Sequence, residues 1–330
     1  MDTNNTHPGI PPAEIWQRLS ANLEGQGYRS RLVSICHVSE LQTGLEKYHQ
    51  ASCFDPGFYH ERLVNFEYHL AIDFQETLSL IIVAYPHPQT RVFFTWQNRL
   101  VPLIIPPTYL HGSRDDKHVQ NLVAVILQPY GYLIADASLP IKLLAVRSGL
   151  GAYGKNNVCY VEELGSFVRL VAFYSDLPCS ADSWREPQMM EACQTCSACV
   201  LKCPTGAITA KRFLLHAERC ITYWNEKPGD IDFPAWLDPT WSNCLVGCLI
   251  CQLICPQNKN FLPGSQDGAV FSQEETAWLL RRISLDRLPV ALAEKIVQFD
   301  LVDYLEILPR NVPVLLKKTK VNPAAQQEDV

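Results

Sequence analysis

The chain lacks several features that would place it in common functional classes. It has no uninterrupted apolar run of the roughly 18 residues that suggest a membrane-spanning helix. Its polar, proline-containing start, Met1 to Pro12, has no apolar signal-peptide core. Its formal net charge of −6 gives no overall positive field to attract nucleic acid. These absences predict a cytoplasmic protein without a membrane segment.

Cysteine is scarce in the first 180 residues, which contain only four of the thirteen, and dense afterwards. Nine cysteines lie between Cys193 and Cys255. Disulfides are rare in a reducing compartment, so this density indicates metal or redox chemistry. The change in cysteine content, together with the polar stretch 180–187, predicts a domain boundary near residue 180.

Patterns of apolar residues predict a mixed fold. With 330 residues, 47% of them hydrophobic, the chain is long enough for two or three domains with packed cores. The first region interleaves expected strands (78–85, 91–96, 100–105, 158–161 and 166–174) with expected helices (13–23, 118–127 and 141–146). The last region is helical, with Ser272-Gln-Glu-Glu275 as a capping box for a helix over 274–283 and another helix over 291–299. The polar end, 322–330, is expected to be disordered.

The dense cysteines form two related motifs. The first, Cys193-Gln-Thr-Cys196-Ser-Ala-Cys199-Val-Leu-Lys-Cys203-Pro204, has the pattern C-x2-C-x2-C-x3-C-P, and a partial copy follows as Cys248-Leu-Ile-Cys251-Gln-Leu-Ile-Cys255-Pro256. A cubane takes one thiolate on each iron, so a tight loop supplies three sulfurs to one cube while the fourth cysteine serves a second cube. The prolines are expected to keep Cys203 and Cys255 out of helix. The motifs predict two [4Fe–4S] clusters.

Crossed ligation follows from this spacing. One cluster takes Cys193, Cys196, Cys199 and Cys255, and the other takes Cys203, Cys248, Cys251 and one more cysteine. Both Cys220 and Cys244 are within reach for that last position, and spacing alone does not choose between them. Two zinc sites are the alternative, but zinc ribbons use separated C-x2-C pairs rather than three cysteines in one tight run.

Several segments resemble epoxyqueuosine reductases. Near the cysteines these are Thr205-Gly-Ala-Ile208, Glu218-Arg-Cys220-Ile-Thr-Tyr and Gly247-Cys-Leu-Ile-Cys-Gln-Leu-Ile-Cys-Pro-Gln-Asn258. In the first region, Arg147-Ser-Gly-Leu-Gly-Ala-Tyr-Gly-Lys-Asn156 is similar to that family's Gly-Leu-Gly-x-x-Gly-Lys-Asn signature. Gly165-Ser-Phe167 and Leu308-Pro-Arg-Asn311 also match family positions.

The resemblance implies how the chain is organised and what it binds. We expect an α+β fold: a mixed α/β, corrinoid-binding-type domain over 1–180, a bacterial ferredoxin-like double [4Fe–4S] domain over 181–265, and a helical C-terminal segment over 266–330. The family implies a cobalamin that receives electrons through both clusters from an external low-potential donor, such as a ferredoxin or flavodoxin. By position in the motif, Cys220 is the last cluster ligand.

Corrinoid contacts are expected from the glycine-rich signature and from one tyrosine. The signature residues are Gly149, Gly151, Tyr153, Gly154, Lys155 and Asn156. Glycines would let the backbone approach a large flat cofactor, and Lys155 would meet its amide or phosphate groups. Tyr109, which follows a rigid double proline, would line the same pocket.

The chain departs from the family at the expected proton donor. The family carries a Val-Asp-Ser-Ala-Pro-type segment with a catalytic Asp, whereas this chain reads Ile134-Ala-Asp-Ala-Ser-Leu-Pro-Ile-Lys142. An ungapped count back from Gly149 places Ala135 at the acid position, and Asp136 reaches it with a one-residue shift. Asp136 is the candidate catalytic acid, and a turn or helix-cap aspartate before Pro140 is the alternative.

These features predict a cobalamin-dependent iron–sulfur reductase. Its substrate is the epoxyqueuosine base of tRNA or a small molecule, and salt-sensitive tRNA binding would distinguish the two. A protein of another class, a ferredoxin-type electron carrier, would have the clusters but no corrinoid.

Overall fold

The computed structural model describes residues 10–68 and 76–321, so the expected disorder over 322–330 lies outside the described residues. The chain divides into two units, Met1–Pro86 with Gly112–Cys196, and His87–His111 with Ser197–Val330. The organisation into segments 1–180, 181–265 and 266–330 stays a prediction. Over the described ranges, no helix combines the length and the apolar character that crossing a bilayer requires.

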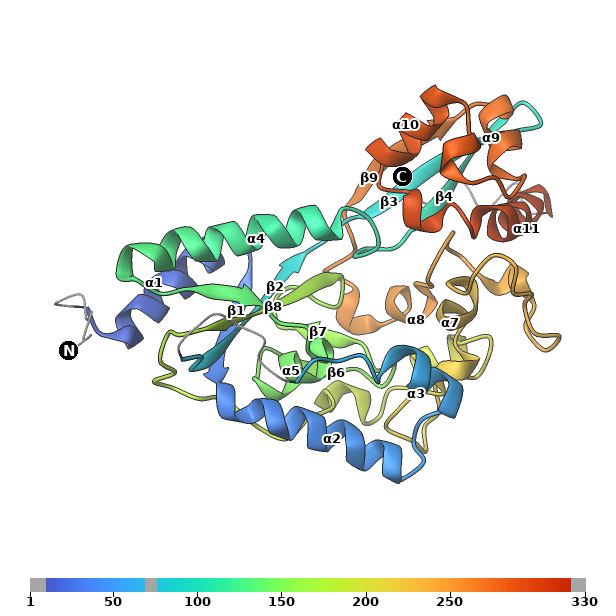
Figure 1. The fold of residues 1–330 in the computed structure, drawn as a ribbon. Helices are drawn as coiled ribbons and strands as arrows, with labels where there is room; N and C mark the ends of the chain where they lie inside the picture. The colour runs from blue at the N-terminus through green and yellow to red at the C-terminus, as the bar shows by residue number, and fades with distance from the viewer. Residues whose placement is uncertain (1–9, 69–75, 322–330) are drawn as a thin grey trace. The chain divides into compact units, whose positions relative to one another are not determined.

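The first unit is built on a four-stranded antiparallel sheet (Figure 1). The strands, in spatial order, are β1 Arg29–Ser34, β2 Ser79–Pro86, β8 Val168–Ser175 and β5 Ile134–Asp136. The helices are α1 Pro12–Gly25, α2 Val38–Gln50, α3 Pro56–Arg62, α4 Gly112–Leu127 and α5 Ile141–Arg147. Figure 1 shows α1 and α4 on one side of the sheet and α2 and α5 on the other.

Strand β2 forms the centre of this unit because its side chains are buried on both faces of the sheet. On one face, Ile81 and Val83 belong to the same apolar cluster as Leu19 of α1 and Val123 of α4. Full burial of such aliphatic side chains stabilises the fold by about 1.5–3 kcal/mol each. The continuous apolar run over 78–85 is therefore a covered central strand, as predicted.

A small hairpin carries the glycine-rich sequence. It consists of β6 Gly151–Tyr153 and β7 Cys159–Val161, paired antiparallel. Gly149, just after α5, has a φ of +75°, which glycine adopts without strain, so this glycine closes α5.

The second unit has a three-stranded sheet in the order β4-β3-β9. β3 Gln89–Trp96 and β4 Arg99–Ile105 form a hairpin, and β9 Ser265–Phe271 joins β3 in parallel. Gln97 and Asn98 connect the hairpin with φ angles of 50° and 59°, the left-handed pair that a type I′ turn requires. Strand β9 was not predicted, because its polar start, Ser265-Gln-Asp-Gly, shows no apolar alternation.

Three helices pack with this sheet in one apolar core: α9 Gln273–Leu279, α10 Val290–Gln298 and α11 Leu308–Val321. The capping box is confirmed, since the Glu275 N–H donates to the Ser272 hydroxyl at 3.1 Å and the Ser272 N–H donates to the Glu275 carboxylate at 2.8 Å. The helix expected over 274–283 ends early, because Arg282 adopts a φ of 49° that no right-handed helix can contain.

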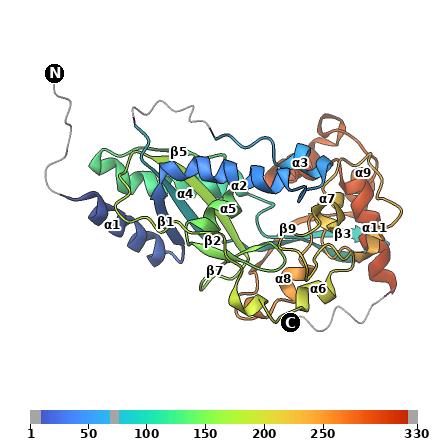
Figure 2. The same cartoon turned by 90° about the horizontal axis from the view of Figure 1, so that it is seen from below.

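Three short helices lie in the cysteine-rich part of the second unit: α6 Ala198–Lys202, α7 Ile221–Asn225 and α8 Ile250–Leu253. Helix α6 packs against α8, and Figure 2 shows the two side by side. The 3₁₀ turns of the two units are η1 Ile35–His37, η2 Gln128–Tyr130, η3 Glu191–Cys193, η4 Ala217–Arg219, η5 Pro239–Trp241, η6 Pro256–Asn258, η7 Leu285–Arg287 and η8 Val302–Tyr304.

Candidate iron–sulfur site

The first cysteine motif folds into a tight turn followed by a short helix. Cys193 ends η3, and Cys199 lies in α6; both are buried. Cys203 follows α6 with φ −67° and ψ 112°, which is the extended conformation expected before Pro204. Its thiol lies 3.5 Å from the Thr205 hydroxyl.

The second motif repeats this local geometry. Cys251 lies in α8, and Cys255 follows that helix with φ −72° and ψ 122°, directly before Pro256. The expectation that both proline-preceding cysteines leave the helix is confirmed. Helices α6 and α8 pack together, so the parts of the two motifs that these helices carry lie in one region of the second unit.

Cys220 lies among the thiols of the second motif set. Burial raises the pKa of the Cys220 thiol, and the nearby Cys203 thiol raises it further. Burial also raises the pKa of Cys248 to about 12, with further contributions from Cys220 and Cys203. Cys244 is buried too, but its thiol donates to the Asn243 side-chain oxygen at 3.4 Å. Burial and the nearby Cys248 thiol raise the pKa of Cys244 as well, so Cys203, Cys220, Cys244 and Cys248 form one group of neighbouring thiols.

The donor set matches a pair of cubanes in kind and number. The two motifs with Cys220 supply eight of the thirteen cysteines. Within residues 10–68 and 76–321, no three His, Cys, Asp or Glu side chains converge as they would around a single metal ion. A cubane presents a separate iron to each thiolate, so its ligands do not need to converge on one point.

Arg310 and Asn311 fix the backbone around Cys220. The Asn311 amide donates to the carbonyls of Asn225 and Leu245, each at 2.9 Å. The Arg310 guanidinium donates to five carbonyls after Cys220, those of Trp224, Asn225, Lys227, Pro228 and Ile231. Asn225 and Leu245 are buried, and buried carbonyls need donors. Arg310 and Asn311 therefore give Leu308-Pro-Arg-Asn311 a structural role. The sequence predicted only that Leu308-Pro-Arg-Asn311 resembles the family, and it gave no sign that these side chains bind backbone carbonyls.

Tyr109 lies beside the second cysteine motif. Its hydroxyl donates to the Glu226 carboxylate, and burial together with that carboxylate raises its pKa well above the usual value. A Cβ on Gly247 would lie 2.6 Å from the same hydroxyl, so the chain before Cys248 passes directly against Tyr109. Its expected place in a corrinoid pocket stays a prediction.

The glycine-rich hairpin is packed against its own protein. A Cβ on Gly151 would lie 2.6 Å from the Tyr160 carbonyl, and one on Gly154 would collide with the Asn156 side chain and the Tyr160 ring. The Asn156 amide donates to the Tyr160 hydroxyl at 3.0 Å, and the Lys155 ammonium donates to the Cys196 carbonyl at 2.7 Å. Packing within the protein therefore accounts for Gly151 and Gly154. The corrinoid contacts expected from the glycine-rich signature stay a prediction.

Comparison with known proteins identifies the relatives. Residues 192–258 match a family model described as a 4Fe-4S double cluster binding domain. The chain is 36% identical to the epoxyqueuosine reductase of Burkholderia pseudomallei over 185 residues, 50% of this chain and 44% of that protein. It is 37% identical to the Escherichia coli enzyme over 141 residues, 42% of this chain and 35% of that protein. The chain is a homologue of epoxyqueuosine reductases.

Solved epoxyqueuosine reductases share the fold. The structure from Streptococcus thermophilus superposes with a TM-score of 0.65 at 16% identity, and the one from Bacillus subtilis with 0.61 at 19%. Each alignment covers 94% of this chain and 83% of the other. An epoxyqueuosine reductase solved with an epoxyqueuosine-modified tRNA-Tyr stem loop gives 0.60 at 19% identity, covering 95% and 84%. The resemblance and the α+β fold class predicted from the sequence are confirmed. In sequence, the chain matches less than half the length of these two curated epoxyqueuosine reductases.

Asp136, aligned only by a shift to the catalytic acid of epoxyqueuosine reductases, lies in a cavity of the first unit. The cavity has a volume of about 400 Å³ and is also lined by Asp116, Lys117, Gln120 and Leu139. Asp136 ends β5, and its carboxylate accepts a hydrogen bond from the Gln120 amide at 3.1 Å. Its role as the catalytic acid stays a prediction.

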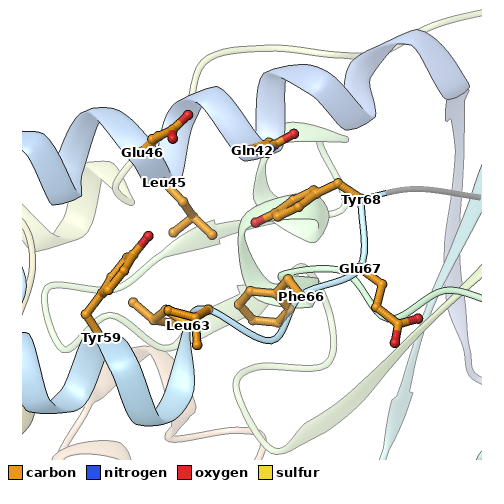
Figure 3. A pocket seen from close by; sticks show the side chains of 9 residues that line it. Gln42, Leu45, Glu46, Tyr59, Leu63, Phe66, Glu67 and Tyr68 are labelled. Carbon is orange, nitrogen blue, oxygen red and sulfur yellow. The ribbon is translucent and has the colours of Figure 1, made fainter.

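A second cavity in this unit escaped the sequence analysis. It has a volume of about 540 Å³ and lies between α2, α3 and the chain that follows α3 (Figure 3). Aromatic rings of Tyr59, Phe66 and Tyr68 line it, together with Glu46 and Glu67. Burial raises the pKa of Tyr68 to about 12, so its hydroxyl stays a donor at neutral pH. The signal in the sequence was the density of aromatic residues over 54–68, three phenylalanines and two tyrosines.

Proposed function

We propose that the chain is an iron–sulfur reductase in which two [4Fe–4S] clusters carry electrons from an external low-potential donor toward a substrate site. The observation that carries the proposal is the double cysteine motif, which matches a double-cluster domain in a chain with the epoxyqueuosine reductase fold. One cluster takes Cys193, Cys196, Cys199 and Cys255, and the other takes Cys203, Cys220, Cys248 and Cys251. A ferredoxin or flavodoxin is the class of donor that matches cluster potentials at the low end of their range.

The resemblance implies a cobalamin as the last electron carrier, and we propose that the chain takes one up. When bound, it would supply cobalt-centred electron transfer to the substrate. Its contacts would come from the glycine-rich signature over 149–156 and from Tyr109, as the resemblance implies. What the chain itself contributes is the candidate catalytic acid: Asp136 is positioned at the cavity wall by a hydrogen bond from the Gln120 amide.

The substrate class follows from the relatives and from the altered acid segment. One epoxyqueuosine reductase with this fold was solved with a tRNA stem loop, which supports the epoxyqueuosine base of tRNA as substrate. The replacement of the usual segment by Ile134-Ala-Asp-Ala-Ser-Leu-Pro supports a small molecule instead. Binding of an epoxyqueuosine-modified stem loop that weakens with salt would support the tRNA substrate, and no binding at low salt would exclude it.

An electron carrier without corrinoid is the second candidate. The observation that favours it is the close protein packing at Gly151 and Gly154, where a Cβ would collide with neighbouring atoms. This packing alone requires glycine at both positions, without a bound cofactor. In that case the chain would transfer electrons between partners and would not reduce a substrate itself.

Anaerobic purification with added cobalamin separates the two candidates. Iron, acid-labile sulfide and cobalt are measured on the same sample, together with visible absorption. About eight irons with one cobalt per chain supports the reductase. Eight irons without cobalt supports the electron carrier, and a colourless protein with zinc contradicts both.

A further inference from the structure

The β6–β7 hairpin holds the chain that enters the first cysteine motif. The Tyr153 N–H donates to the Gln188 carbonyl, and the Met190 N–H donates to the Tyr153 carbonyl, both at 2.9 Å. These bonds form a parallel bridge between Tyr153 and Met189. The Cys193 N–H then donates to the Met190 carbonyl at 2.9 Å. The hairpin therefore fixes the backbone one turn before the first cluster cysteine.

Lys155 extends this hold into the motif. Its ammonium donates to the carbonyl of Cys196, a cluster cysteine 41 residues further along the chain, at 2.7 Å. Two backbone hydrogen bonds close the turn that carries Lys155. The Gly154 N–H donates to the Val158 carbonyl, and the Asn157 N–H donates to the Gly154 carbonyl, each at 2.9 Å. Asn157 takes a φ of 57° there. A half-buried lysine on such a closed turn has little freedom to leave its carbonyl partner.

Within the described residues, the Lys155 ammonium bonds to a carbonyl and to no carboxylate. A cubane with four thiolate ligands is negatively charged and gains a further negative charge on reduction. Net charge and hydrogen bonding near the sulfurs are among the factors that set its potential. An unpaired cation at the ligand loop stabilises the reduced form more than the oxidised form.

We propose that Lys155 is a positioning residue for the first cluster: it holds the Cys196 backbone and makes that cluster easier to reduce than it would be without the cation. This inference rests on the cluster assignment of the proposed function, but not on the corrinoid or the substrate. It gives the Gly-Lys-Asn end of the signature a role at an iron–sulfur cluster.

The test compares midpoint potentials of both clusters in intact protein, by redox titration followed with electron paramagnetic resonance. The variants are Lys155→Met, which removes bond and charge, Lys155→Gln, which keeps a donor without charge, and Lys155→Arg, which keeps both. Lys47→Met, an exposed lysine of α2, is the matched control. Iron and sulfide content are measured for each.

In Lys155→Gln and Lys155→Met, the midpoint potential of one cluster should fall. We expect a decrease of about 59 mV, which corresponds to a tenfold smaller equilibrium constant for one-electron reduction. Lys155→Arg should have the wild-type potential, and so should Lys47→Met. Unchanged potentials in Lys155→Gln would overturn the inference, whatever Lys155→Met does to iron content. Such a result with eight irons in the wild type would leave the reductase proposal intact, whereas a wild type without clusters would defeat the proposed function itself.

Discussion

Asn225 and Gly247 exchange two hydrogen bonds that join the chain after Cys220 to the chain before Cys248. The Asn225 amide donates to the Gly247 carbonyl at 2.7 Å, and the Gly247 N–H donates to the Asn225 side-chain oxygen at 2.9 Å. Asn225 is buried, so water cannot replace either bond without rearrangement. Two cysteines assigned to one cluster are thereby held by a single side chain.

Asn225→Ala should therefore destabilise both the fold and one cluster. Leaving a buried backbone donor or acceptor unpaired costs about 1–3 kcal/mol for each group. We expect a lower Tm and iron content that falls toward four per chain. Asn260→Ala, at an exposed position in the same motif region, is the control and should change neither. A variant with full iron content and wild-type Tm would contradict the structural role of Asn225.

Gly247→Ala tests the contact with Tyr109. Gly247 has a φ of +67°, and its Cβ would lie 2.6 Å from the tyrosine hydroxyl. Gly206 has a similar φ of +64° with nothing within 4 Å of its Cβ. Both alanine variants carry the left-handed backbone cost of about 1 kcal/mol, but only Gly247→Ala also displaces Tyr109. Denaturant unfolding should show the larger loss for Gly247→Ala, and equal losses would mean that the close contact has no energetic consequence.

The last cluster ligand can be identified by serine substitution. Cys220→Ser should lose one cluster, leaving about four irons, because the resemblance assigns Cys220 as the last ligand and it neighbours Cys203 and Cys248. Cys244→Ser should keep about eight irons, since its thiol bonds to Asn243. Iron and sulfide analysis of anaerobically purified protein provides the measurement. The reverse pattern would transfer the ligand role to Cys244.

Asp136→Asn tests the proton donor. Loss of a general acid lowers turnover by about 10²–10⁴-fold, and we expect this loss with iron and cobalt contents unchanged. The assay is reduction of an epoxyqueuosine-modified stem loop, with Asp303→Asn, an exposed aspartate of the second unit, as control. Full activity in Asp136→Asn would remove this residue from the catalytic machinery.

A histidine held by two carboxylates gives a pH-dependent contribution in the first unit. His37 meets Glu40 at 2.5 Å through Nδ1 and Asp182 at 2.6 Å through Nε2. The hydrogen bond to His37 is the main cause that lowers the pKa of Glu40 below 4.5. A lowered pKa in the folded state adds stability above that value, and this stability is lost as the pH falls through the folded pKa.

Glu40→Gln should accordingly lower the Tm at neutral pH, and the difference from wild type should shrink below about pH 4.5. The effect is small because the Glu40 side chain is 46% exposed. Thermal melts between pH 3 and 7 provide the measurement, and Glu24→Gln on α1 serves as the exposed control. A Tm difference that does not depend on pH would mean that the ionised carboxylate of Glu40 is not what stabilises this contact.

The sequence by itself determined the features that depend on neighbours along the chain. The spacing of Cys193, Cys196 and Cys199 specifies a cubane loop, and the prolines after Cys203 and Cys255 dictate extended backbone at both positions. The capping box at Ser272 and the central strand over 78–85 were equally readable. In each case the deciding interaction spans only a few residues.

Only the tertiary structure decided which distant residues meet. Lys155 reaches Cys196 across 41 residues, and Asn225 reaches Gly247 across 22. The grouping of Cys220 with Cys248 and the parallel pairing of β9 with β3 are of the same kind. Such contacts form when packing of the whole unit repays the entropy of closing long loops, and no local pattern in the sequence encodes that balance.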